Sequence, residues 1–185
     1  IYKSLKGFKP TKVEITADVS GVKDLILQND QAVLDPSKPF LPFGSRPFIG
    51  SNFYIGSREV FQKKLDKLWL RFKWNDLPPS TFGNYYREYE NTNSRQNSAF
   101  LVDIKCLDEK KWKPEEITTT TALFTDNNGN GKANFETLPG VDETSLIKVD
   151  ASINGIERDE LLKTFDQFDH SNTKGFLRLT LKGKN

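Results

Sequence analysis

The most motif-like stretch of the chain, residues 126–136, begins like a calcium-binding loop. Oxygen-bearing side chains stand at its first, third and fifth positions, Asp126, Asn128 and Asn130, and a glycine follows at the sixth. Ca²⁺ prefers such oxygens, and a bidentate acid at the twelfth position normally completes the set. Here Glu136 falls one position early, and Asn-Gly pairs are equally typical of tight β-turns. We favour a turn, and keep Asp126, Asn128, Asn130 and Glu136 as an alternative calcium site.

The single histidine, His170, stands between Asp169 and Ser171, so an acid, an imidazole and a hydroxyl are neighbours in sequence. Members of a catalytic triad usually converge from separate elements. A nucleophilic serine generally lies on an elbow of the G-x-S-x-G type, which this chain lacks. We therefore expect polar loop residues here and predict no catalytic residue.

Carboxylate chemistry is the other catalytic option, since a β-rich hydrolase can place two acids across a groove. The spacing of the acids singles out no pair. Asp103 is predicted to face outward from a strand and Glu115 to lie at a loop edge, so both are interpreted as solvated surface. Glycine-rich loops that cradle phosphates are missing, and we expect no cofactor.

Composition narrows the function classes further. The chain has 185 residues, with 27 Lys and Arg against 25 Asp and Glu, and a net charge of +2 argues against binding polyanions by bulk charge. One Cys cannot form an internal disulfide. No apolar run approaches the roughly 20 residues of a membrane-spanning helix, so no membrane contact is expected. The chain starts at Ile1 and contains no Met, which suggests a part excised from a longer chain.

Aromatic residues make up 12% of the chain and recur in runs of alternating polarity, the period of a half-buried strand. Helical spacing is confined to short segments, one of them preceded by Ser57 as a capping residue. We predict an all-β fold, a two-sheet antiparallel sandwich of the jelly-roll or immunoglobulin type, as one domain over residues 1–185. One to three short helices lie on its connections. The expected strands are 12–19, 24–28, 51–55, 67–74, 99–107, 117–124, 146–153 and 176–182, and the expected helices are 58–64, 80–91 and 156–168.

The segment 29–50 is dense in proline and glycine, which favours a loop, yet it carries Phe40, Phe43 and Phe48. Disordered linkers rarely hold so many rings, so we expect this loop to be ordered and held against the body of the domain or a partner. On the strand 67–74, Trp69 is predicted to face out and could stack on bases or sugars. Packing under a crossing loop, or a protein interface, is the favoured interpretation; carbohydrate comes next and nucleic acid last.

Three stretches resemble a known family. They are PFLPFGSRPFIGSNFYIGSREVF (39–61, continued by KKL at 63–65), LWLRFKWNDLP (68–78) and TKGFLRLTL (173–181). The chain resembles baseplate J-like proteins of phage-tail-like contractile injection systems. The resemblance implies an inserted region between the portions that assemble a baseplate wedge, with a structural role.

The sequence therefore predicts an assembly domain that acts through protein–protein contacts; the alternative is a carbohydrate-binding β-sandwich module. Expected partners are other baseplate proteins or the rest of its own chain. We expect the protein to assemble in the cytoplasm and then to form part of a released or virion-like particle. A few buried rings usually dominate such interfaces. The interface candidates are Phe40, Phe43, Arg46, Phe48, Tyr54 and Trp69.

Overall fold

The computed structural model describes eight segments of the chain and one isolated residue. These are residues 21–22, 24–63, 65, 68–75, 82–88, 99–115, 120–124, 144–148 and 166–183. The predicted strand at 12–19, the 126–136 loop and all but the last three residues of the predicted helix at 156–168 lie outside them.

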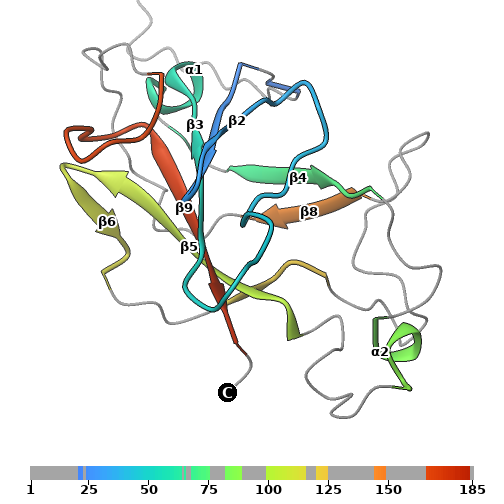
Figure 1. Ribbon diagram of the computed structural model, residues 1–185. Coiled ribbons are helices and arrows are strands. Elements are labelled where there is room, and N and C mark those ends of the chain that lie inside the picture. The colour runs from blue at the N-terminus through green and yellow to red at the C-terminus, as the bar shows by residue number, and fades with distance from the viewer. Residues whose placement is uncertain are drawn as a thin grey trace, which may run out of the picture.

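The regular elements among the described residues are mostly strands, with two single-turn helices (Figure 1). The strands are β1 (Ile26–Asn29), β2 (Val33–Leu34), β3 (Asn52–Gly56), β4 (Trp69–Lys73), β5 (Leu101–Asp108), β6 (Lys111–Lys113), β7 (Thr121–Ala122), β8 (Thr144–Lys148) and β9 (Phe176–Lys182). The helices are α1 (Arg58–Phe61) and α2 (Phe82–Tyr85).

The larger sheet has the strand order β2-β1-β3-β9-β5-β6, and β7 also pairs with β5. Every pairing in it is antiparallel. β4 and β8 form a separate antiparallel pair (Figure 1). The prediction of an all-β antiparallel fold with few short helices is confirmed. The second sheet has two strands within the described residues, so the full two-sheet sandwich stays a prediction.

One face of the larger sheet carries the hydrophobic core, because side chains alternate between the two faces of a strand. Phe53 on β3 is directly opposite Leu179 on β9, which in turn is opposite Ile104 on β5. All three are buried. Leu70 and Phe72 of β4 pack onto this cluster, as the alternation in 67–74 predicts. Arg71 and Lys73, which alternate with them, are exposed.

The opposite face carries a second cluster around Phe168. Its ring stacks on Tyr54 at 4.6 Å between centroids and lies 5.4 Å from Trp112. The Arg178 guanidinium lies 4.5 Å above the Trp112 ring. The side-chain amide of Gln28 holds the backbone of Phe168 in place. Its Oε1 accepts a hydrogen bond from Phe168 N at 3.0 Å, and its Nε2 donates one to Phe168 O at 3.4 Å. Burial raises the pKa of Tyr54, and the charge of Asp30 adds to this.

The local signals account for several element boundaries. Ser57 caps α1, and its hydroxyl accepts a hydrogen bond from Val60 N at 3.2 Å. The helix ends at Phe61, so the predicted extension to residue 64 is wrong for residues 62 and 63, which form a turn. β2 and β6 were not predicted. Each is only two or three residues long, too short for alternation to show.

The prediction that Asp103 is solvated is wrong. Asp103 is 5% exposed, and its carboxylate forms an ion pair with Lys182 at 2.9 Å. Leu107, on the same face of β5, is also buried. Both faces of this central strand are covered, so alternation alone cannot tell which of its polar residues meets water.

Phe53 is the best single test of this core. Phe53→Ala should lower the free energy of unfolding by about 3–5 kcal/mol, because the ring is 1% exposed and its removal leaves a cavity. Chemical denaturation followed by tryptophan fluorescence measures the change. The matched aromatic control is Tyr85→Ala: that ring is 54% exposed, so a change below about 0.5 kcal/mol is expected. Similar losses in the two variants would contradict the assigned core.

Candidate functional site

The segment from residue 35 to residue 51, which we call the aromatic loop, connects β2 to β3 (Figure 1). Two of its rings are packed inward onto β3. The centroid of Phe40 lies 5.8 Å from that of Phe53, and the centroid of Phe43 lies 6.1 Å from it. The prediction that this loop is ordered and held against the body of the domain is confirmed.

A buried polar anchor also holds the loop. Asn29, 4% exposed, accepts hydrogen bonds from Gln31 N and Ala32 N, both at 2.9 Å, through its side-chain oxygen. Its side-chain nitrogen donates to Leu41 O at 3.1 Å. One amide thus shapes the turn after β1 and ties the middle of the loop to the end of that strand. A buried amide with these partners is satisfied at both ends.

The loop ends in a β-turn from Phe48 to Ser51, which we call the contact turn. Ser51 N donates to Phe48 O at 3.0 Å, and Phe48 N donates to the Ser51 hydroxyl at 3.0 Å. Gly50 has φ +99°, the left-handed conformation that the third residue of a type II turn requires. Gly50 N donates to Leu181 O, and Leu181 N donates to Ser51 O, both at 2.9 Å. The turn therefore continues the β3–β9 pairing.

The contact turn holds two large apolar side chains in solvent. Phe48 is 67% exposed and Ile49 is 70% exposed. The Ile49 side chain leans over Gly183, where an added Cβ would come within 2.6 Å of its Cδ1. Arg46, two residues before Phe48, is also exposed. An ordered backbone that presents bare apolar groups beside a cation has the chemistry of a protein contact.

The interface candidates thus fall into two groups. Phe40, Phe43 and Tyr54 are partly buried in contacts within the chain, so they serve packing here. Arg46 and Phe48 are exposed. Trp69 is the first residue of β4, and its role in an interface stays a prediction. Ile49 and Leu41, the latter 61% exposed, were not predicted. The signal for Ile49 was the glycine after it, which marks a turn and so an exposed position before it.

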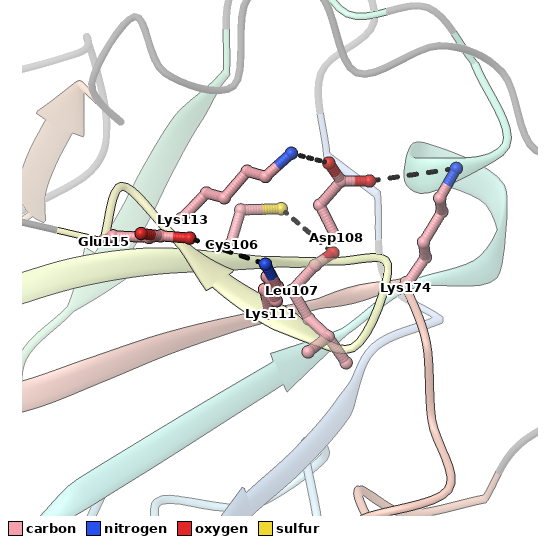
Figure 2. Close-up of polar contacts among 7 residues, drawn as sticks. All are labelled: Cys106, Leu107, Asp108, Lys111, Lys113, Glu115 and Lys174. Carbon is pink, nitrogen blue, oxygen red and sulfur yellow. Dashed lines mark hydrogen bonds and ion pairs between the residues drawn. The ribbon is translucent and has the colours of Figure 1, made fainter.

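A second polar cluster gathers at the β5–β6 hairpin. Figure 2 shows the Asp108 carboxylate between two lysines, with Lys113 Nζ at 2.6 Å and Lys174 Nζ at 3.8 Å. The hydrogen bond that Lys113 donates, together with the charge of Asp108, raises the pKa of Lys113. On the same hairpin, Lys111 Nζ lies 3.9 Å from Glu115 Oε1. Each of these lysines faces an acid of the same chain.

The turn of this hairpin has an unusual sequence. Glu109 and Lys110 both have positive φ, 48° and 66°, as a two-residue type I′ turn requires, although neither is Gly or Asn. Lys110 N donates to Thr173 O at 3.0 Å, which ties the turn to the segment before β9. With the Asp108 ion pairs, this contact compensates for the unfavourable backbone. The cluster therefore has a structural explanation.

Several lysines that could contact nucleic acid have acidic partners within the chain. Lys63 Nζ forms an ion pair with Glu59 Oε1 at 2.9 Å. Lys111 is paired with Glu115, and Lys113 is paired with Asp108. Lys64 and Lys67 lie outside the described residues. These ion pairs reduce the positive charge that Lys63, Lys111 and Lys113 offer to a phosphate backbone.

The Asp169-His170-Ser171 group forms a loop. Asp169 accepts a hydrogen bond from Ser171 N at 2.6 Å, and the Ser171 contacts lower the pKa of Asp169. Its carboxylate is thus used by the local backbone. Among the described residues, no three His, Cys, Asp or Glu side chains are grouped to hold a metal ion. The calcium alternative at 126–136 lies outside those residues.

A family model for baseplate protein PVC11-like matches residues 5–152, most of the chain. The chain belongs to this family. It is a structural baseplate protein of a contractile injection system, a component of a phage-tail-like particle. The resemblance to baseplate proteins of contractile injection systems is confirmed, whereas the match does not single out the J-like members. No curated protein gives a significant match. In the described part of this baseplate protein, no helix is long and apolar enough to cross a membrane.

Cys106 lies in the core of the protein and serves as a probe of it. The residue is 2% exposed, and its thiol donates weakly to Leu107 O at 3.7 Å. Burial raises the pKa of the Cys106 thiol to about 12, and the charge of Asp108 adds to this. The native thiol is therefore protonated and shielded, which makes it unreactive at neutral pH.

The Cys106 pKa predicts a pH dependence of stability. Above pH 9.0 the unfolded thiol ionises while the folded thiol keeps its proton until about pH 12. The free energy of unfolding should fall as pH rises between these values, by up to about 1.4 kcal/mol per pH unit. Urea unfolding at several pH values measures this slope. In Cys106→Ala the slope should be shallower, since lysines and tyrosines titrate in both proteins. Equal slopes would contradict the assignment.

Proposed function

We propose that this baseplate protein acts through protein–protein contacts, with no catalytic step, and that the aromatic loop supplies one of its contact surfaces. The observation that carries the proposal is the contact turn, where Phe48 and Ile49 are exposed on a backbone held by hydrogen bonds at both ends. Membership in a baseplate family supports partners that are other baseplate proteins.

The energetics favour such a use. Burying one large apolar side chain contributes about 1.5–3 kcal/mol. Much of this is normally lost in ordering the loop that carries it, but here the order is already present in the free chain. Phe40 and Phe43 hold the loop against Phe53, so the exposed pair can bind without a large conformational cost.

The carbohydrate alternative has less support from the described rings. A sugar-binding platform needs exposed, coplanar rings. Tyr85 is exposed, but it meets Tyr86 edge to face at 89°. Tyr54 and Phe168 are parallel but stack on each other. Carbohydrate binding would therefore have to use Trp69 as its stacking residue. We do not propose this function.

The proposal includes the finer assignment implied by the resemblance. The chain would be an inserted region of a baseplate J-like protein, folded as one β-sandwich domain between wedge-forming portions. It would assemble in the cytoplasm and then travel with the released particle. The three stretches quoted above support this finer assignment, and the family match supports its coarser part, a baseplate protein.

A deletion strain tests the proposed function. Deletion of the coding region for residues 21–183 should abolish complete particles, because a baseplate component would be missing. Negative-stain microscopy and quantitative mass spectrometry of purified particles measure the outcome. Complementation with the intact gene is the control. Normal yields of complete particles after deletion, or particles that lack the wild-type chain, would refute a structural role.

A further inference from the structure

We propose that the contact turn inserts into an apolar pocket, rimmed by carboxylates, on a different baseplate subunit. This inference rests on the proposed function and specifies the chemistry of its partner. The proposal concerns Phe48 and Ile49 as the inserted groups and Arg46 as the charged group at the rim.

Three of the four backbone N–H groups in the turn are already hydrogen-bonded, which favours recognition through side chains. Phe48 N donates to the Ser51 hydroxyl, Gly50 N to Leu181 O, and Ser51 N to Phe48 O. These bonds leave the turn little capacity to pair with an added strand, which needs free main-chain donors and acceptors. Two adjacent apolar side chains on a convex turn instead match an apolar pocket. Aromatic anchors of this kind often dominate interface energies.

Charge defines the rim of the pocket. Arg46 is exposed, and no described residue forms an ion pair with it. Pro47 alone separates it from Phe48 and restricts the backbone between them. Arginine is enriched at interfaces, where its planar fork pairs with carboxylates. An acidic group at the edge of the partner's pocket therefore complements the guanidinium.

A second copy of this chain fits the same surface poorly. Self-association about a two-fold axis places the same patch on both sides, so Arg46 would approach Arg46. Two acids in neighbouring segments are already engaged, since Asp30 accepts from Asn52 N at 2.7 Å and Asp35 from the Ser37 hydroxyl at 2.6 Å. A different subunit with its own acids avoids this repulsion.

Site-specific photocrosslinking in intact particles tests the inference. A benzophenone amino acid replaces Phe48 in the full-length protein, and the same amino acid at Ser37, an exposed residue of the same loop, is the matched control. After irradiation of purified particles, mass spectrometry maps the joined peptides. We expect position 48, and not position 37, to join a different baseplate subunit at a site that contains apolar residues and at least one Asp or Glu.

Variants give an independent readout in the same particles. Phe48→Ala should raise the rate at which the protein is lost from diluted particles about 10-fold or more, the effect of truncating an interface anchor. Arg46→Glu should also raise it, and more strongly at low salt than at high salt. Tyr85→Ala, which removes another exposed ring, should leave the rate unchanged. Unaltered melting temperatures of the isolated variants show that folding is intact.

The outcomes separate the inference from the proposed function. If the wild-type protein is absent from particles, the structural role fails, and this inference fails with it. If the protein is present but position 48 joins only its own chain, a second copy or nothing, the inference alone is overturned. The same holds if Phe48→Ala is retained as well as Tyr85→Ala.

Discussion

The pairing of β9 between β3 and β5 is the constraint on which the rest of the structure depends. It joins segments more than 70 residues apart along the chain into one sheet, and its register decides which side chains share a face. With Leu179 opposite both Phe53 and Ile104, every second residue enters the core. A slip of one residue would turn Arg178 inward and Leu179 outward, at a high desolvation cost.

The same register organises both surfaces of the sheet. On the core face, the rings of the aromatic loop cover Phe53, which lets a proline-rich connection stay ordered without regular structure. On the other face, Phe168 and Trp112 cover Tyr54 and Arg178. Burial lowers the pKa of Arg178, yet the stacked indole still favours its charge. The contact turn lies outside both of these clusters, and its Phe48 stays exposed to solvent.

Much of the strand pattern was predictable, because alternation in β3, β4, β5 and β9 reports burial directly. The N-cap at Ser57 was predictable for the same local reason. Asp103 was not, since its burial depends on what covers the second face of the sheet, a property that alternation does not encode. The role of each ring in the aromatic loop was also beyond the sequence. Phe40 and Phe48 have similar proline-rich surroundings, and only tertiary contacts send one ring inward and the other into solvent.

Translation reaches β9 after every other described strand, although β9 lies in the middle of the sheet. While the ribosome is still making the preceding residues, β3 and β5 have no strand between them. A chain whose stabilising pairs are so distant in sequence folds late and slowly. Leu181 also supplies the hydrogen bonds that complete the turn at Phe48. A copy that ends before β9 would thus lack the strand that joins β3 to β5 and the hydrogen bonds that complete the contact turn.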